Sequence, residues 1–210
     1  MERAFAQYDA ADQIDITWKS FQLDPDMDKD SSISTLEYLV DRKGYPKEQV
    51  AMMSAQLAEQ GKDYGIDFQF DKARSFNTFD AHRLLHWAKQ AGKSNALKET
   101  LMVDHFTKGI DLSVKEQLMK AASAVGLDSA KASEVLDSDQ FGEQVRHDIY
   151  QSRQLGVSGV PFFLINEKTA IGGAQPDQVF ENAVAAALKD LSTSLNISDA
   201  KVCTPDQGCT

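Results

Sequence analysis

The two cysteines of the chain are the first candidates for chemistry. Cys203 and Cys209 stand in the C-terminal sequence CTPDQGC, with five residues between them. Pro205 and Gly208 favour a turn there, and a disulfide forms when the two Cα atoms come within about 7 Å. The pair is either an accessory redox pair or two reduced thiols in an exposed tail. Because the spacing is not that of a C-x-x-C motif, the chemistry of that motif is not transferred to it.

Two histidines, His82 and His86, are four residues apart in a segment with a helical pattern. This spacing places both imidazoles on one helix face and can bind zinc. Beyond Asp80, however, no cysteine or acidic residue stands at a suitable spacing, and the H-E-x-x-H pattern is not met. We therefore expect no metal site, and we expect the two side chains on a partly buried or cleft-facing side of the helix.

A proline, Pro161, directly precedes an apolar run in the sequence GVSGVPFFLINEKTAIGGAQ of residues 156–175. Proline has no N–H to donate to a strand ladder, so it occupies the first residue of a strand, an edge or a bulge. The residues alone leave two interpretations open. Pro161 is an ordinary trans-proline at a strand start, or it belongs to a loop whose backbone groups face a ligand.

The elements around this proline follow from the pattern. PFFLIN and TAIGG are short apolar runs joined by a tight turn at Glu167-Lys168, which predicts a β-hairpin. Pro176 then opens a helix, DQVFENAVAAALKDL, with apolar residues at helical spacing. The remaining residues are polar and end in the two cysteines.

Upstream of the hairpin the pattern is mostly helical. We expect a helix over residues 2–11, a strand over the alternating residues 14–18, and helices from about residue 34 to about residue 155. Helix starts are predicted from capping residues and from a proline at the first helical position; these are Ser34 with Glu37, Pro46, Asn77 with Asp80, and Ser113 with Glu116. Helix ends are predicted at Gly92, Gly109 and Gly126.

Composition and charge exclude several functional classes. The 210 residues include 42% hydrophobic and 26% charged residues, which is typical of a globular protein. A net charge of -10 argues against nucleic-acid binding and against binding to anionic membranes, because both need clustered lysine and arginine. No apolar stretch is long enough to span a membrane, and the N-terminal sequence MERAFAQYDAADQIDI does not have the pattern of a secretory signal. We therefore expect a soluble cytoplasmic protein.

Three segments together resemble a known family. They are WKSFQLDPD at 18–26, SFNTFDAHRLLHWAKQAGKS at 75–94, and the proline-containing sequence at 156–175. They resemble the DsbA-like branch of the thioredoxin fold and, within it, the FrnE-like dithiol oxidoreductases. That branch is related to 2-hydroxychromene-2-carboxylate isomerase and to the kappa class of glutathione transferases.

The resemblance implies a fold class and a domain organisation. The fold class is α/β (α+β), a thioredoxin fold with a large all-helical insertion. The implied divisions are a thioredoxin-fold domain at 1–33 and 152–192, a helical insertion at 34–151, and a mobile C-terminal tail at 193–210.

The resemblance also implies a function, that of a thiol–disulfide oxidoreductase acting as a protein disulfide oxidoreductase or isomerase. In that family Pro161 is cis and stands opposite the redox cysteines, and Gly159, Val160 and Pro161 bind the substrate. Asn77, Phe79 and His82 are implied to line a substrate groove, although Asn77 is first a helix cap. The implied partners are protein or peptide thiols and disulfides, or a small-molecule thiol. No tightly bound cofactor is expected, and glutathione is the candidate co-substrate.

The same resemblance exposes a gap. Family members begin with a strand and a C-x-x-C motif, whereas Met1 falls inside the helix that follows that motif. Either the sequence starts late, or a natural variant lost the motif, or another chain supplies it. A missing central strand would leave strand edges open for oligomer formation. Two alternative functions stay open: a glutathione-dependent isomerase or transferase, and a non-catalytic peptide-binding module.

Overall fold

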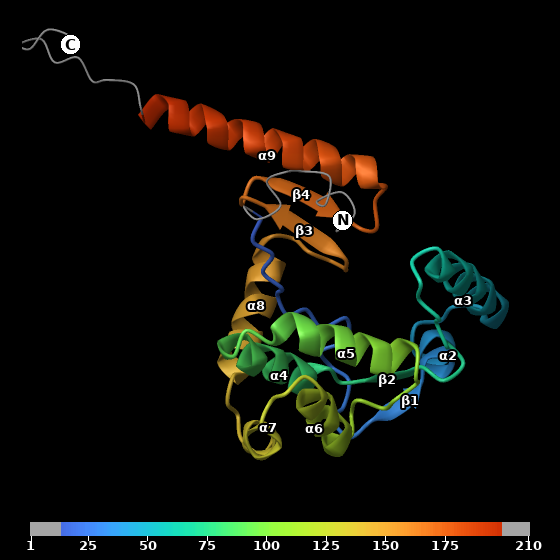
Figure 1. Ribbon diagram of the computed structural model, residues 1–210. Coiled ribbons are helices and arrows are strands. Elements are labelled where there is room, and N and C mark those ends of the chain that lie inside the picture. The colour runs from blue at the N-terminus through green and yellow to red at the C-terminus, as the bar shows by residue number, and fades with distance from the viewer. Residues whose placement is uncertain (1–13, 199–210) are drawn as a thin grey trace, which may run out of the picture. The chain divides into compact units, whose positions relative to one another are not determined.

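The computed structural model describes residues 14–198, which divide into two compact units (Figure 1). Residues 14–18 and 156–198 form the hairpin unit, and residues 19–155 form the helical unit. The predicted domain boundaries lay after residues 33 and 151, whereas the contacts group residues 19–33 with the helices. The predicted helix at 2–11 and both cysteines lie outside the described residues.

The helical unit contains eight helical segments and two short strands among its described residues, 19–155. In chain order they are β1 (Ser32–Ser34), α2 (Thr35–Glu37), the π-helix η2 (Tyr38–Arg42), α3 (Lys47–Lys62), β2 (Arg74–Phe76), α4 (Phe79–Gln90), α5 (Ser94–Phe106), α6 (Lys115–Ala124), α7 (Ser129–Leu136) and α8 (Gly142–Gln154). Strands β1 and β2 pair antiparallel, with Ile33 opposite Ser75. None of the helices in the described part of the chain is long and apolar enough to cross a membrane.

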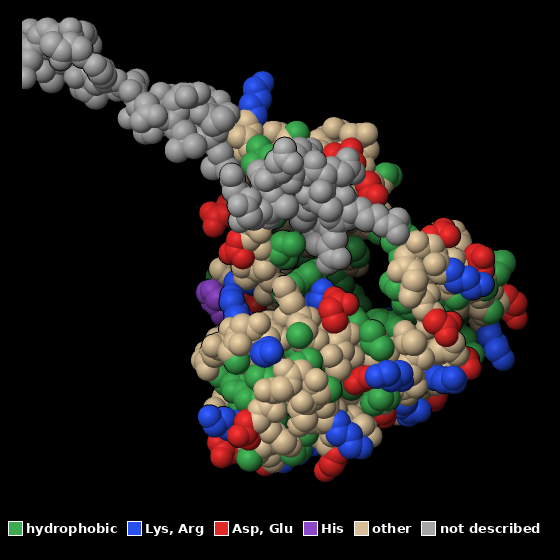
Figure 2. Space-filling model, in the orientation of Figure 1, with side chains coloured by type: hydrophobic (Ala, Val, Ile, Leu, Met, Phe, Trp, Pro, Cys, Tyr) green, Lys and Arg blue, Asp and Glu red, His purple; other side chains and the backbone are tan. Residues whose placement is uncertain are grey.

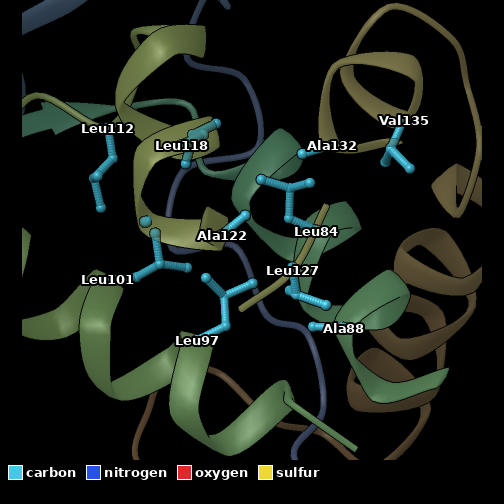
Figure 3. Close-up of a cluster of buried hydrophobic side chains, with 11 residues drawn as sticks. Leu84, Ala88, Leu97, Leu101, Leu112, Leu118, Ala122, Leu127, Ala132 and Val135 are labelled. Atoms are coloured by element: carbon cyan, nitrogen blue, oxygen red, sulfur yellow. The ribbon is translucent and has the colours of Figure 1, made fainter. Parts of the chain in front are cut away.

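The core of the helical unit lies where α4, α5, α6 and α7 meet. Figure 3 shows their buried side chains converging, with Leu84 of α4, Leu97 of α5 and Leu118 of α6 among them. The apolar stripe predicted for α4 is confirmed, because Leu84 and Ala88 are fully buried in this core. Each fully buried leucine contributes about 1.5–3 kcal/mol of transfer free energy, so this cluster is the main source of stability in the unit.

The predicted helix starts are confirmed in one case and corrected in others. The Ser34 hydroxyl accepts a hydrogen bond from the Glu37 amide, as expected of an N-cap. The prediction for Ser113 is wrong: its hydroxyl and its amide both donate to the Asp111 carboxylate instead, and α6 begins at Lys115. The acidic neighbour two residues away competes for the serine, so the capping pattern is not used there.

Two other helix starts are each displaced by one residue. Pro46 is the N-cap of α3 and not its first helical residue. Helix α4 has Thr78 as its N-cap, but Thr78 makes no side-chain capping bond. Instead, the side chain of Asn77, the residue before the N-cap, accepts a hydrogen bond from the amide of Phe79, the first helical residue. The left-handed φ angles of Gly92, Gly109 and Gly126 agree with the predicted helix ends.

The surface of the helical unit carries mixed charge. Figure 2 shows lysine, arginine, aspartate and glutamate side chains interspersed on the visible face. Charged side chains of the unit form surface ion pairs, including Arg146 with Asp139 and Glu143. Exposed ion pairs of this kind contribute little to stability, about 0–1 kcal/mol each.

The hairpin unit consists of β3 (Phe162–Ile165), β4 (Thr169–Gly172) and α9 (Asp177–Ser198). The strands pair antiparallel, with Phe163 opposite Ile171. Helix α9 covers the hairpin through Phe180, whose ring meets that of Phe163 edge-on at a centroid distance of 4.9 Å. Ile171 and Phe180 are buried at this contact. The predicted hairpin and the helix that follows it are confirmed.

The expected strand at residues 14–18 is not present, and the prediction is wrong. These residues are assigned neither helix nor strand. Alternating apolar and polar residues make a segment fit for a sheet, but a strand also needs a neighbour that completes its ladder. Among residues 14–198, β3 and β4 pair only with each other, so the segment has no such neighbour.

The hairpin turn is centred one residue earlier than predicted. Asn166 and Glu167 both have left-handed φ angles, 48° and 58°, and the Lys168 amide donates to the Ile165 carbonyl at 3.0 Å. Two successive left-handed residues define the type I′ turn, whose twist matches that of paired strands. Asparagine tolerates this conformation well, whereas glutamate does not.

Replacing Glu167 with glycine is therefore expected to stabilise the hairpin by about 0.5–1 kcal/mol, because glycine adopts a left-handed φ without a steric penalty. Amide hydrogen exchange of β3 and β4 should slow by about two- to fivefold. Ala170→Gly, an exposed position within β4, is the matched control and should accelerate exchange, since glycine destabilises a strand interior. Faster exchange in Glu167→Gly would contradict the assignment of the turn.

Candidate functional site

The loop before β3 carries the most distinctive backbone of the hairpin unit. It runs from Gly156, which has a left-handed φ of 70°, to Pro161. The Val160–Pro161 peptide bond is cis. The Pro161 carbonyl accepts a hydrogen bond from the Gly173 amide at 2.8 Å, which fastens the end of the loop to the residue after β4.

This loop and the end of β4 surround an open hollow of about 420 Å³. Its lining residues are Gly156, Val157, Ser158, Gly159, Val160, Pro161, Phe162, Gly172 and Gly173. Open space remains where a Cβ atom would stand on Gly159 or Gly172. The hollow is therefore lined largely by main chain and small apolar side chains, with no ionisable group among its lining residues.

Val160 is an exposed residue of this loop and lines the hollow. Its side chain is half exposed, and within residues 14–198 its backbone N–H and C=O have no hydrogen-bond partner. The next residues already belong to the ladder, since Phe162 pairs with Gly172. An accessible donor and acceptor at the start of a strand can bind the main chain of an extended peptide.

Asn77, predicted as a substrate-groove residue, has its polar atoms engaged within the helical unit. Its Oδ1 accepts hydrogen bonds from the Phe79 amide at 2.9 Å and from Gln22 Nε2 at 3.0 Å. Its Nδ2 donates to the Met27 carbonyl at 2.7 Å. The side chain thus joins the segment before β1 to the start of α4.

Phe79 and His82, the other predicted groove residues, also have partners in the helical unit. Lys29 Nζ and the Arg146 guanidinium lie 5.5 Å and 5.6 Å from the centre of the Phe79 ring, which is cation–π distance. His82 Nε2 lies 3.1 Å from the Phe21 carbonyl. Burial lowers the pKa of His82 to about 4. The imidazole is therefore neutral at neutral pH and donates Nε2–H to that carbonyl.

The contacts of His86 with a serine and an aspartate were not foreseen from the sequence. His86 Nε2 lies 3.2 Å from Ser20 Oγ and 3.1 Å from Asp148 Oδ2. These residues come from the segment after Trp18, from α4 and from α8, so no local sequence pattern relates them. Hydrolytic Ser-His-Asp catalysis uses opposite ring nitrogens for the serine and the aspartate, whereas here one nitrogen faces both, and Ser20 is buried. The cluster is therefore a structural network.

The histidines are not joined by a third metal ligand. Within residues 14–198, no group of three or more histidine, cysteine, aspartate or glutamate side chains is placed to hold a metal ion. Both histidines contact the segment that follows Trp18. His82 contacts the Phe21 carbonyl, and His86 contacts the Ser20 hydroxyl. Their four-residue spacing serves to hold this segment against α4.

The structure thus brings the predicted site residues together in two groups. Gly159, Val160 and Pro161 form the loop of the hairpin unit, while Asn77, Phe79 and His82 lie at the start of α4 in the helical unit. Cys203 and Cys209 lie outside the described residues. The substrate-binding roles of both groups stay predictions.

The hairpin unit has a proline loop before β3 and a helix that covers the hairpin, and the helical unit is inserted before it in the chain. These features are those of the thioredoxin-like class that the resemblance implied. The chain belongs to the DsbA-like thioredoxin domain family, whose sequence profile matches residues 1–185. The predicted family and fold class, a thioredoxin fold with a large helical insertion, are confirmed.

Individual relatives agree with this assignment. The crystal structure of a probable DsbA oxidoreductase from Streptomyces coelicolor is 29% identical in sequence and superimposes with a TM-score of 0.86. That alignment covers 100% of this chain and 90% of the other. The chain is also 23% identical, over 184 residues, to the uncharacterized protein YwbO of Bacillus subtilis, covering 87% of this chain and 86% of that protein.

Proposed function

We propose that this chain takes part in thiol–disulfide exchange on protein or peptide substrates, with the Gly159–Pro161 loop as the substrate-docking surface. Membership in the DsbA-like family and the similarity to a probable DsbA oxidoreductase support the class of reaction. The docking role rests on Val160, which is half exposed, lines the hollow and has a backbone without a partner among the described residues. A position in the FrnE-like branch is part of the same proposal.

In this proposal the loop binds and orients the substrate. An extended segment beside Val160 accepts a hydrogen bond from the Val160 N–H and donates one to its C=O, as in strand addition. The substrate sulfur then lies at the Pro161 side of the hollow. Thiol–disulfide exchange needs a thiolate that attacks a disulfide sulfur and releases the other sulfur as a thiolate. Residues 14–198 contain no cysteine, so they supply binding and not the attacking thiol.

A peptide-binding module without redox activity is the second candidate. It is favoured by the backbone of Val160, which has no partner among the described residues and can bind an extended peptide without a thiol. In that case the hollow beside Val160 would hold peptides or a thiol tripeptide such as glutathione without reacting with them.

One pair of measurements separates the two candidates. The full chain is assayed for dithiothreitol-dependent reduction of insulin, and its ¹H–¹⁵N spectrum is titrated with an extended disulfide-containing peptide and separately with oxidised glutathione. The proposal predicts insulin reduction together with shifts of the Gly159 and Val160 amides, while the Gly126 amide in the helical unit stays unchanged.

Each outcome has a distinct meaning. Reduction that disappears in Cys203→Ser assigns the attacking thiol to the C-terminal pair. Shifts at Val160 without insulin reduction support the binding module and contradict the oxidoreductase. If no ligand moves the Gly159 and Val160 amides, the loop is not a docking surface and the proposal fails.

A further inference from the structure

Helix α3 packs on the helical unit through small residues. Its buried and half-buried positions are Val50, Ser54, Ala58 and Gly61, which follow one another at the spacing of a single helix face. The contact is closest at Gly61, where a Cβ atom would stand 2.6 Å from the ring of Phe68. The neighbouring element is η2, and Figure 1 shows α3 beside α2. The side of α3 that faces the unit therefore contributes little apolar area to the core.

The large apolar residues of α3 lie on its outer side. Met52 is 68% exposed, Met53 49% and Leu57 48%. An amphipathic helix normally buries its largest apolar side chains and exposes its small and polar ones. Single exposed apolar residues are common, but α3 reverses the usual order along a whole face. Grouped apolar side chains rimmed by polar residues mark interaction surfaces.

The same outer side of α3 carries no charge. With about 3.6 residues per turn, three glutamines fall beside the apolar residues. We refer to this set as the α3 face: Gln49, Met52, Met53, Gln56, Leu57 and Gln60, all exposed. The charged residues of the helix fall on its remaining side; they are Lys47, Glu48, Glu59 and Lys62. Because methionine adapts to ligands of different shapes, the α3 face is an adaptable uncharged surface in a chain with a net charge of -10.

Two carboxylates border the α3 face along its Met52 edge. Glu48 precedes Met52 by one helical turn, and Glu59 follows it by two. The two glutamates therefore lie on one side of the helix, about 16 Å apart along its axis. Glu59 is paired with Lys62 at 2.6 Å, but both side chains are exposed, so a ligand can compete for this carboxylate at little cost. The border is acidic at both ends and favours a ligand with positive charges at a similar separation.

Size and charge together select the occupant of the α3 face. Helix α3 has 16 residues, so it is about 24 Å long and about 10 Å wide. One face of this size cannot supply the roughly 800 Å² per partner of a stable protein–protein interface. A second copy of the chain would also bring a further charge of -10, and an anionic membrane would be repelled by the two glutamates. A short basic peptide segment fits both the length and the charge.

We propose that the α3 face is a docking surface for an apolar peptide segment with a lysine or arginine at each end. The apolar centre of the segment packs on Met53 and Leu57, and its basic ends pair with Glu48 and Glu59. This binding needs no thiol and does not depend on the proposed exchange reaction. It is detected at amides of α3, whereas docking at the proline loop is detected at Val160, so either proposal can fail without the other.

The first test titrates the full chain with a synthetic peptide of about 14 residues, with leucine and alanine at its centre and two lysines about eleven residues apart. In the ¹H–¹⁵N spectrum the Met53 and Leu57 amides should shift. The variant Met53→Gln/Leu57→Gln should bind at least about tenfold more weakly, because two apolar side chains that the peptide would cover are lost. Met102→Gln/Val103→Gln is the matched control, since these two residues of α5 are similarly exposed. It should keep the affinity within about twofold.

The second test addresses charge. A peptide with glutamates in place of the two lysines should bind at least about fivefold more weakly than the lysine peptide at low ionic strength. The variant Glu48→Gln/Glu59→Gln should remove most of this difference, because it removes the charges that distinguish the two peptides at the α3 face.

Four results would overturn the inference. The first is equal affinity of the lysine peptide for the unchanged chain and for Met53→Gln/Leu57→Gln, and the second is equal affinity of the two peptides. The third is sedimentation of the unchanged chain as a dimer that this variant loses, which would assign the α3 face to a second copy. The fourth is binding to phosphatidylcholine–phosphatidylglycerol vesicles that the variant loses, which would assign it to a membrane.

Both substituted residues are exposed, so Met53→Gln/Leu57→Gln should fold as the unchanged chain does. If it does not, Met52→Gln tests the same surface, because Met52 is the most exposed of the three apolar residues. This single substitution should weaken binding of the lysine peptide about threefold, and an unchanged affinity would also count against the docking surface.

Discussion

Replacing Arg83 with methionine is expected to lower the free energy of unfolding of the helical unit by about 3–5 kcal/mol. Arg83 of α4 is 2% exposed. Its Nε donates to the Gln140 carbonyl at 2.9 Å and its Nη1 to Asp80 Oδ1 at 2.8 Å. Its Nη2 donates to the carbonyls of Val135 and Ser138.

The size of this effect follows from what the guanidinium satisfies. The carbonyls of Val135, Ser138 and Gln140 belong to the last turn of α7 and the residues after it, where the regular helical ladder ends. The Val135 carbonyl also accepts from the Ser138 amide and hydroxyl. Methionine fills a similar volume but donates nothing. The partly buried carbonyls of Ser138 and Gln140 then lose the guanidinium as a donor, the Val135 carbonyl loses its buried charged donor, and a buried acceptor left without a partner costs about 1–3 kcal/mol. The hydrogen bonds from Arg83 to these carbonyls hold α7 and the following turn against α4. Losing these bonds should therefore also loosen the packing of Val135.

Urea denaturation followed by circular dichroism measures the change, through the midpoint and the slope of the unfolding transition. Arg146→Met is the matched control: Arg146 pairs with Asp139 and Glu143 on the surface, so the same substitution should cost about 1 kcal/mol or less. Arg83→Lys should recover only part of the loss, because an ammonium group cannot reach all of these acceptors at once. A cost below about 1 kcal/mol in Arg83→Met would contradict this role.

Acidification from about pH 7.5 to about pH 5 is expected to destabilise the folded chain by about 2 kcal/mol through His82 alone. The unfolded chain binds a proton at this histidine near pH 6.5. In the folded chain, burial lowers the pKa of His82 to about 4. Between these two values the unfolded state holds more protons than the folded state, so stability is complete above about pH 6.5 and declines as the pH falls.

His82→Gln isolates this contribution. Glutamine retains an N–H that can donate to the Phe21 carbonyl but has no proton to gain, so the variant should lose about 2 kcal/mol less than the unchanged chain over the same pH range. Burial also lowers the pKa of His105, but His105 is present in both chains and cancels in the comparison. His147→Gln, on the exposed face of α8, should follow the unchanged chain. Equal losses in the unchanged chain and in His82→Gln would contradict the assignment.

Local patterns predicted the elements whose formation depends on nearby residues. The hairpin followed from two apolar runs and a short connection, and α4 followed from a stripe of small and large apolar residues at helical spacing. The left-handed glycines after α4, α5 and α6 marked helix ends correctly. These signals are reliable because the backbone conformation is decided within a few residues of each one. The Ser113 cap failed for the same local reason, since Asp111 competes for its hydroxyl.

Contacts between distant segments could not be predicted in this way. The alternation of residues 14–18 indicated a strand, but strand formation depends on a ladder partner that the segment itself does not specify. Hydrogen bonds join Ser20, His86 and Asp148 across three separate segments, and the sequence contains no pattern that relates them. Arg83 likewise has the appearance of a surface residue on a helix until α7 is placed over it.

The sequence by itself determined the family, the hairpin with the helix that follows it, and the proline loop at the start of β3. These features depend on residue types at short spacing, which a chain carries before it folds. Only the tertiary structure decided what surrounds each polar side chain. Val160 is half exposed and its backbone has no partner among the described residues. Asn77 and His82, by contrast, form hydrogen bonds inside the helical unit. Burial and hydrogen-bond partners come from segments that meet only in the folded chain, so they are properties of packing and not of local sequence.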